Sequence, residues 1–121
     1  MIKRISQIAF EPENFEESIK SYLDLGFEKV GEFEKENGKA KAVLLRLNGF
    51  DFEIWKFNDK SSKLYPIRNH TGLEVEDIEA ELEKMVKNGC KVRIPITKGI
   101  TVRNYAFVEN SDGQILELIE K

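Results

Sequence analysis

A helix pattern occurs twice in the chain, and the two copies lie 63 positions apart. The first helix follows Asn14 and ends at Gly26, and the second follows Asp77 and ends at Gly89. The matched positions are a capping residue, four apolar residues on one face and a terminating glycine: Asn14, Phe15, Ile19, Tyr22, Leu23 and Gly26 against Asp77, Ile78, Leu82, Met85, Val86 and Gly89. Any two amphipathic helices share some spacing, but this many matches favour a duplication.

Strand-like runs surround each predicted helix. In the first half, one run covers residues 5–10 and three more cover residues 27–34, 40–47 and 50–57. Asn37-Gly38 and Asn48-Gly49 supply the positive φ angles that two-residue hairpins need. The second half starts with a strand over residues 70–75, continues with its helix and ends in further strands. Each half therefore reads as βαβββ, and the chain as an α+β fold.

The halves are predicted to form one domain, with a module over residues 1–58, a module over residues 69–121 and a polar connector over residues 59–68. Either module alone is too small to bury a comfortable core. We therefore expect the modules to pack together or to exchange with those of a second chain.

The composition excludes several classes of function. With 40% hydrophobic and 34% charged residues and a net charge of -3, the 121 residues indicate a soluble globular domain. Lysine and glutamate are evenly mixed and form no basic stripe, so nucleic acid is not an expected partner. No apolar run is long enough for a membrane span, and the first residues lack a signal-peptide pattern, so we expect a cytoplasmic protein without membrane contact.

Two pairs of polar residues occupy equivalent places in the two halves. Gln7 and His70 are 63 positions apart, and Glu53 and Glu117 are 64 apart, a difference that one loop residue absorbs. Strand alternation places Glu117 on an apolar face, where a carboxylate needs an arginine, a solvent-filled cleft or a metal. Glu53 could simply be exposed, because Asp51 shares its face.

His70 is the only histidine, and a lone histidine is more often structural than functional. His70 nevertheless supports a functional site, because it occupies the position equivalent to Gln7 in the second half. The set Gln7, Glu53, His70 and Glu117 offers three oxygen donors and one imidazole nitrogen. Such a set suits a borderline divalent ion such as Ni²⁺, Zn²⁺, Co²⁺ or Mn²⁺.

Four stretches carry a family resemblance: ISQIAF with the helix to LGF, FDFEIW, NHTGLEVEDIEAEL and YAFVENSDGQILELIE. In these the chain resembles the vicinal oxygen chelate superfamily, which contains glyoxalases, bleomycin resistance proteins and extradiol dioxygenases. The ending is most similar to that of glyoxalase I, the lactoylglutathione lyase. The resemblance implies two paired βαβββ modules that form a curled mixed sheet around a cleft, and it implies a homodimer.

In metal-dependent members of this superfamily, ligands lie on the first and last strands of each module. These places fall on Gln7, Glu53, His70 and Glu117, a set that looks like that of one class of glyoxalase I. Extradiol dioxygenases carry a histidine at the place of Gln7, which counts against oxygen chemistry. Methylmalonyl-CoA epimerases typically carry glutamine at the place of Glu53, which weakens the epimerase interpretation.

The resemblance implies a metal-dependent lyase or isomerase that converts a hemithioacetal of a 2-oxoaldehyde through an enediolate. The metal would act as a Lewis acid, and Glu117 is our predicted general base. Two positions depart from the glutathione-using members, which carry an arginine at the place of Glu11 and an asparagine at that of Phe57. We expect Glu11 to repel anionic glutathione, so the thiol cosubstrate stays open.

Two alternatives remain. One is a metal-free binding protein of the bleomycin-resistance type, and the other is a methylmalonyl-CoA epimerase-like isomerase. Residues predicted to line the cleft are Trp55, Phe57, Arg103 and Tyr105. Trp55 and Phe57 could equally pack a core or a dimer interface. Residues 93–104 are predicted to form a loop over the cleft, because Pro95 and Gly99 interrupt any strand.

Overall fold

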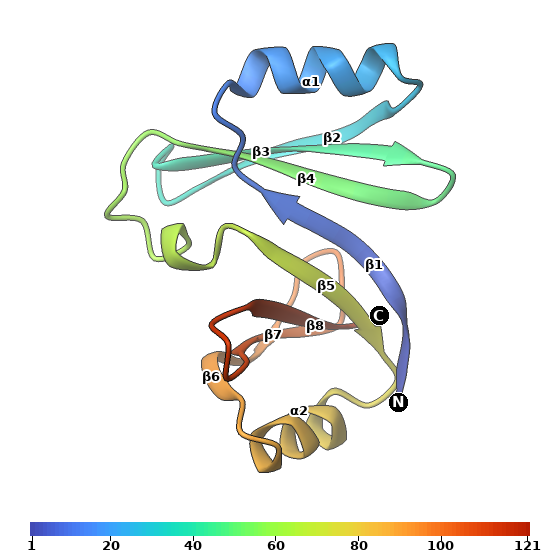
Figure 1. Ribbon diagram of the computed structural model, residues 1–121, viewed down its shortest axis with the longest axis vertical. Helices are drawn as coiled ribbons and strands as arrows, with labels where there is room; N and C mark the ends of the chain where they lie inside the picture. The colour runs from blue at the N-terminus through green and yellow to red at the C-terminus, as the bar shows by residue number, and fades with distance from the viewer. The chain divides into compact units, whose positions relative to one another are not determined.

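A computed structural model describes all 121 residues of the chain, which form two compact units. The first unit, Gln7–Asn69, contains helix α1 (Phe15–Asp24), and we call it the α1 unit. The second joins Met1–Ser6 to His70–Lys121 and contains helix α2 (Ile78–Lys87), and we call it the α2 unit. Strand β1 (Ile2–Phe10) contributes residues to both units (Figure 1).

Four strands of the α1 unit form a sheet in the order β2-β3-β4-β1. Strands β2 (Glu28–Lys35), β3 (Ala40–Leu47) and β4 (Phe50–Phe57) pair antiparallel, whereas β1 lies parallel to β4. Helix α1 runs along one face of this sheet in Figure 1. A short 3-10 helix, η1 (Tyr65–Ile67), follows β4.

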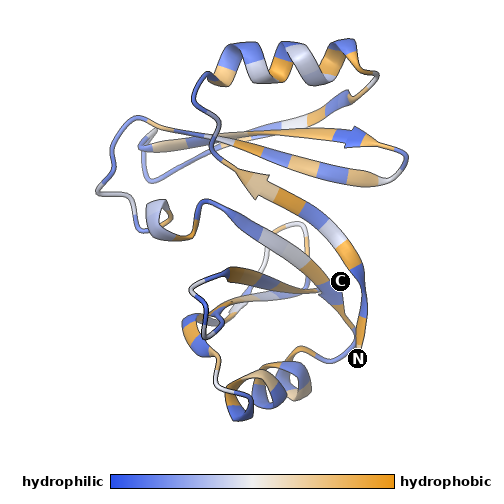
Figure 2. Cartoon of the chain, in the orientation of Figure 1, coloured by the Kyte–Doolittle hydropathy of each residue, from blue (hydrophilic) through white to orange (hydrophobic).

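Both faces of this sheet carry apolar side chains. On the α1 face, Phe15 packs with Val43, Leu45 and Ile54. On the opposite face, Trp55 packs with the alanines Ala9, Ala40 and Ala42. Polar and apolar residues alternate over residues 50–54 of β4 (Figure 2), and Trp55 then adds an apolar side chain to the face that Asp51 and Glu53 share.

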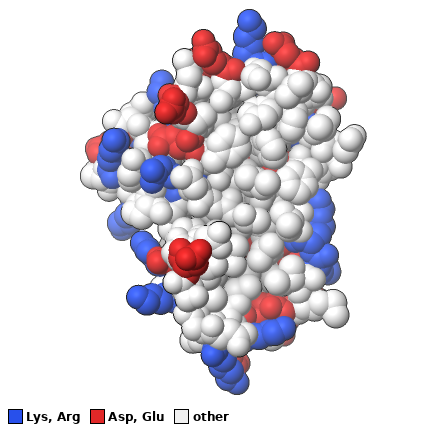
Figure 3. Space-filling model, viewed as in Figure 1, with Lys and Arg blue, Asp and Glu red and all other residues white.

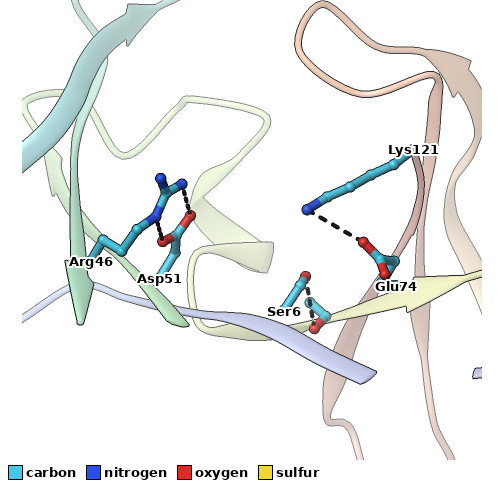
Figure 4. Close-up of polar contacts among 6 residues, drawn as sticks. Ser6, Arg46, Asp51, Glu74 and Lys121 are labelled. Carbon is cyan, nitrogen blue, oxygen red and sulfur yellow. Dashed lines mark hydrogen bonds and ion pairs between the residues drawn. The ribbon is translucent and has the colours of Figure 1, made fainter. Parts of the chain in front are cut away.

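The α2 unit repeats this order. Its strands are β5 (His70–Val75), β6 (Lys91–Lys98), β7 (Asn104–Glu109) and β8 (Ile115–Glu120). The sheet order is β1-β5-β8-β7-β6, with β5 parallel to β8 and the pairs β8-β7 and β7-β6 antiparallel. The α2 core is a cluster of Val75, Ile78, Ala106 and Leu118. At the β1 edge, the Ser6 hydroxyl donates to the Gly72 carbonyl at 3.4 Å (Figure 4).

The predicted α+β fold with its two βαβββ repeats is confirmed. The ends of both helices also match the prediction. The Asn14 side chain accepts a hydrogen bond from the Glu17 N–H at 3.0 Å, and the Asp77 side chain accepts one from the Ala80 N–H at 3.2 Å. After the helices, Gly26 and Gly89 have φ angles of 106° and 98°, which favour glycine.

Two details of the helices and hairpins differ from the prediction. Leu23 and Val86 were expected to face inward, but they are 42% and 47% exposed, because they lie at the rim of each apolar stripe. The β3-β4 hairpin has the expected turn, with positive φ at Asn48 and Gly49. The β2-β3 connection spans residues 36–39 rather than two residues, and its Glu36 also adopts a positive φ of 53°.

The Glu36 carboxylate, which lies in this longer turn, binds the later connector. It accepts hydrogen bonds from the Ser62 hydroxyl and the Lys63 N–H, which together hold the pKa of Glu36 below its ordinary value. The connector is therefore more than a polar tether. Ser62 and Ile67 are each 3% exposed.

The predicted loop over residues 93–104 is wrong in most of its length. Strand β6 continues to Lys98, so only residues 99–103 connect β6 to β7. Pro95 is tolerated because β6 is the edge strand of its sheet, and the pairing with β7 is irregular between Ile94 and Thr97.

The surface matches the predicted mixing of charge. On the face drawn in Figure 3, basic and acidic side chains are interspersed. Neither helix has the length and apolar character that a membrane-spanning segment needs.

Candidate metal centre and proton-transfer site

Gln7 and Glu53 lie on the same face of the α1 sheet. In the parallel pairing of β1 with β4, Gln7 is opposite Asp51 and Ala9 is opposite Glu53. Paired residues of neighbouring strands point to the same face, so these four side chains share the face opposite α1. Glu53 therefore sits diagonally across from Gln7, next to the small Ala9. The arrangement places a carboxamide and a carboxylate on one surface.

The Glu53 carboxylate has a defined partner. Its Oε1 accepts a hydrogen bond of 2.8 Å from the indole Nε1–H of Trp55. Glu53 is 9% exposed and Trp55 is 5% exposed, so both groups are withdrawn from solvent. A buried carboxylate requires such a partner, and this one donates a single N–H and accepts nothing. The expectation that Glu53 could simply be exposed is wrong.

Asp51, the neighbour of Gln7 across the strands, is paired with an arginine. The Arg46 guanidinium donates two hydrogen bonds to it, from Nε at 2.7 Å and from Nη2 at 3.1 Å (Figure 4). This fork-shaped pairing raises the pKa of Arg46 above its ordinary value. Sequence reasoning missed Arg46. The two-residue Asn48-Gly49 turn was the available signal, because it sets Arg46 opposite Asp51.

His70 and Glu117 form the equivalent pair in the α2 unit. In the parallel pairing of β5 with β8, His70 is opposite Ile115 and Gly72 is opposite Glu117. His70 Nε2 lies 3.3 Å from Glu117 Oε1, and the side chains are 3% and 14% exposed. The Phe107 ring packs edge-on against the imidazole, with 4.9 Å between ring centroids. The Glu117 carboxylate and the His70 imidazole are thus in contact next to the Phe107 ring.

The two pairs have the same register. In the α1 unit, Glu53 lies two residues after the partner of Gln7, and the small Ala9 lies opposite Glu53. In the α2 unit, Glu117 lies two residues after the partner of His70, and the small Gly72 lies opposite Glu117. The one-position difference in sequence spacing therefore falls outside these strand pairs. The sequence repeat predicted that Gln7 matches His70 and that Glu53 matches Glu117, and the strand pairing of the two units agrees with this.

As a donor set, these residues suit a divalent ion. Two carboxylates, an imidazole and a carboxamide match the ligands of borderline metals, and three of the four side chains are largely buried: Glu53, His70 and Glu117. The structure contains no group of three or more histidine, cysteine, aspartate or glutamate residues that could hold a metal ion. Gln7, Glu53, His70 and Glu117 stay our predicted ligands, and Glu117 stays our predicted base.

Comparison with known families identifies the chain's relatives. The model of the Glyoxalase/Bleomycin resistance protein/Dioxygenase superfamily matches residues 4–118. The chain belongs to this superfamily. The match confirms the resemblance to the vicinal oxygen chelate group. No curated protein sequence matches the chain.

Several solved structures share the glyoxalase-superfamily fold with the chain. A methylmalonyl-CoA epimerase from Mycobacterium tuberculosis is 18% identical, with a TM-score of 0.78 over 98% of this chain and 88% of that one. A Streptomyces coelicolor methylmalonyl-CoA epimerase variant in complex with 2-nitronate-propionyl-CoA is 16% identical, with a TM-score of 0.79 over 100% and 96%. The hypothetical protein BH1468 from Bacillus halodurans C-125 is 18% identical, with a TM-score of 0.77 over 98% and 94%. At these identities the likeness shows the fold.

Glutathione-using glyoxalases carry an arginine at the place of Glu11. In this chain the negative charge of Glu11 is paired with the positive charge of Arg68. Its Oε1 lies 3.1 Å from Arg68 Nε, and its Oε2 accepts a hydrogen bond of 3.1 Å from the Phe57 N–H. The Arg68 guanidinium also lies 3.8 Å from the centre of the Tyr65 ring. The expected repulsion of an anionic thiol by Glu11 is therefore weaker than the sequence suggested.

The four predicted cleft residues divide between the units. In the α1 unit, Trp55 is buried, and Phe57 stacks on it with centroids 5.4 Å apart. In the α2 unit, Tyr105 packs edge-on against Phe107, and the Arg103 side chain is 76% exposed. A surface pocket of about 350 Å³ in the α1 unit is lined by residues 11–16 and 55–57. It includes Trp55 and Phe57 but neither Gln7 nor Glu53.

Proposed function

We propose that this chain is a metal-dependent isomerase that removes a proton from a carbon next to a carbonyl group. The observation that carries the proposal is the pairing of His70 with Glu117, which sets a carboxylate beside an imidazole on a largely apolar face. The equivalent Gln7 and Glu53 complete the donor set. A family fold alone would not support this, because the superfamily includes proteins with different activities.

The residues would divide the work as follows. Gln7, Glu53 and His70 would hold a divalent ion, with Glu117 as a fourth ligand that leaves the metal when it acts as the base. When bound, the ion would polarise the carbonyl oxygen and stabilise the negative charge that develops as the proton leaves. The Glu117 carboxylate would take the proton from carbon. Phe107 would limit the access of water to His70.

The first substrate class is an acyl thioester that carries an acidic C–H. The structural likeness to methylmalonyl-CoA epimerases, one solved with 2-nitronate-propionyl-CoA, supports this class over the hemithioacetal that the sequence suggested. Inversion of the centre would then require a proton to return to the opposite face of the same carbon from solvent, because Glu117 lies on the face from which the first proton left.

The hemithioacetal of a 2-oxoaldehyde is the second candidate. Glu53 favours it, because methylmalonyl-CoA epimerases typically carry glutamine at this place. Glu117 would then return the proton to the neighbouring carbon. The neutralisation of Glu11 by Arg68 leaves glutathione among the thiols to be assayed.

Proton exchange in deuterated water tests both substrates at once. The protein, loaded with Zn²⁺, Ni²⁺, Co²⁺ or Mn²⁺, would be incubated with methylmalonyl-CoA or with hemithioacetals of methylglyoxal and several thiols, and NMR would follow the C–H signal. We expect metal-dependent loss of that signal with one substrate class, and Glu117→Gln should abolish it. Tight binding of these ligands without exchange under any metal would overturn the proposal and favour a metal-free binding protein.

The predicted homodimer belongs to the same proposal. Light scattering after size exclusion should give about twice the monomer mass of 14.0 kDa. A monomer with full activity would show that the chain builds its site without a second copy.

A further inference from the structure

We infer that Trp55 is a positioning residue, whose indole N–H fixes the orientation of the Glu53 carboxylate for metal binding. The inference rests on the proposed function, because it concerns Glu53 as a metal ligand. Its starting point is the hydrogen bond of 2.8 Å from Trp55 Nε1 to Glu53 Oε1 between two buried side chains. The sequence had suggested that Trp55 stacks on a ligand or packs a core, and neither reading gave its N–H a role.

The indole is held from several sides, so its N–H points in a fixed direction. Its ring lies against the alanines of β1 and β3, whose small side chains make room for it: Ala9, Ala40 and Ala42. Phe57 stacks on it at an interplanar angle of 20°, and Phe33 meets it edge-on at 5.5 Å between centroids. A side chain packed in this way keeps one rotamer, so its single donor is preorganised.

The chemistry of the indole suits an outer partner of a metal ligand. The indole N–H donates and cannot accept, and it does not bind divalent ions in competition with the carboxylate. By engaging Oε1, it would fix the plane of the carboxylate and so the direction from which the carboxylate can meet a metal. Outer partners of this kind orient ligands, and their loss typically lowers metal affinity about 10- to 100-fold.

The α2 unit has no indole at the position that matches Trp55. The residue two positions after Glu117, on the same strand face, is Ile119, which has no hydrogen-bond donor in its side chain. Glu117 is instead placed beside His70. Of the two equivalent glutamates, Glu53 is therefore the one whose orientation is fixed by an indole. This agrees with the assignment of proton transfer to the other, Glu117.

Trp55 is the only tryptophan, so its N–H gives one signal in a proton–nitrogen NMR spectrum. We expect this signal to move when Zn²⁺ is added to the metal-free protein and to broaden with Mn²⁺. Two replacements would remove the N–H: Trp55→Phe, and benzothienylalanine at position 55, in which sulfur takes the place of the N–H group with little change of shape. Both should weaken Zn²⁺ binding about 10- to 100-fold by calorimetry.

Phe52→Leu is the matched control, since it removes an aromatic ring from the same strand on the α1 face and leaves the indole and its packing in place. Its Zn²⁺ affinity should stay within about threefold of the wild type. Wild-type Zn²⁺ affinity in the benzothienylalanine protein, with an unmoved indole signal in the native protein, would overturn the role of Trp55 while leaving the metal site intact. If the native protein binds none of the metals, the proposed function fails together with the inference.

Discussion

Glu53 and Glu117 occupy the same register position in two copies of one βαβββ pattern, yet their surroundings differ. Glu53 accepts a hydrogen bond from the Trp55 indole, whereas Glu117 lies 3.3 Å from His70 Nε2. A rigid uncharged donor holds the first carboxylate, and the second faces a group that can itself bind metal or a proton. Equivalent backbone positions thus carry side-chain environments suited to different tasks.

The helix N-termini show the same divergence. In the α2 unit the Glu120 carboxylate accepts hydrogen bonds from the Asn104 amide at 2.7 Å and from the first helical N–H, that of Ile78, at 3.2 Å. In the α1 unit the matching strand position holds Lys56, whose Nζ lies 6.0 Å from the centre of the Phe15 ring. An anion is favourable at a helix N-terminus and a cation is not. The two repeats therefore keep the same helix although one has a glutamate and the other a lysine near its N-terminus.

The largest expected difference between the units concerns catalysis. Glu117→Gln should lower kcat about 10²- to 10⁴-fold at saturating metal, because it removes the proposed base. Glu53→Gln should act mainly through weaker metal binding and leave more of kcat when metal is saturating. Steady-state rates over a Zn²⁺ series would separate the two effects. A greater kcat loss for Glu53→Gln at saturation would reverse the roles.

Core truncations test whether the two units are equally important for stability. Leu45 in the α1 unit and Leu118 in the α2 unit are both 0% exposed. Replacing either by alanine should lower the free energy of unfolding by about 2–5 kcal/mol, measured by urea denaturation. Matching shifts of a single transition would show that the units unfold together. Two transitions, each moved by only one variant, would show that they unfold separately.

Removal of the helix caps should have a smaller effect. Asn14→Ala and Asp77→Ala each delete the acceptor for a helical N–H, and each should destabilise by about 1 kcal/mol in thermal or urea unfolding. Asp77→Asn is the control, because asparagine caps as well and occurs naturally at the equivalent Asn14. A full loss with Asp77→Asn would mean that the charge, rather than the cap, is what stabilises α2.

The smallest effect concerns the pH dependence of Glu120. Hydrogen bonds from Asn104 and Ile78, helped by nearby Arg103, hold the pKa of Glu120 below its ordinary value. Folding then favours the ionised form, so the stabilisation is present above that value and disappears as pH falls through the lower folded pKa. Glu120→Gln should cost about 0.5–1 kcal/mol near neutral pH, and its difference from wild type should shrink at an acidic pH below the lowered folded pKa.

Lys56→Gln, at the matching place in the α1 unit, provides the comparison for Glu120. It should change stability by less than about 0.5 kcal/mol at either pH, since Lys56 is exposed. A destabilisation by Glu120→Gln that stays the same at both pH values would contradict the role of the carboxylate charge.

Most of the fold could be predicted because its signals are local. Helical spacing, the caps and the terminating glycines predicted both helices, and the 63-residue repeat placed Gln7 and His70 in equivalent positions. The Trp55 contact was within reach, since strand alternation puts Glu53 and Trp55 on one face. Its hydrogen bond nevertheless depends on the rotamer that the surrounding alanines allow, which no periodicity reveals.

Other features depend on contacts between distant segments. The Glu11–Arg68 ion pair and the binding of Glu36 by Ser62 join residues whose proximity follows only from the folded connector. Pro95 suggested a loop because sequence alone did not identify its strand as a sheet edge, where proline is permitted. The ligand roles of Gln7, Glu53, His70 and Glu117 stay predictions, supported by register and donor chemistry.

The metal content of the purified protein tests the central claim most directly. Elemental mass spectrometry should find about one Ni, Zn, Co or Mn per native chain, and a His70→Ala, Glu117→Ala double variant that still folds should have lost it. A native protein that contains none of these metals, and takes none up on titration, would contradict the four-residue site and the proton-transfer chemistry proposed for it.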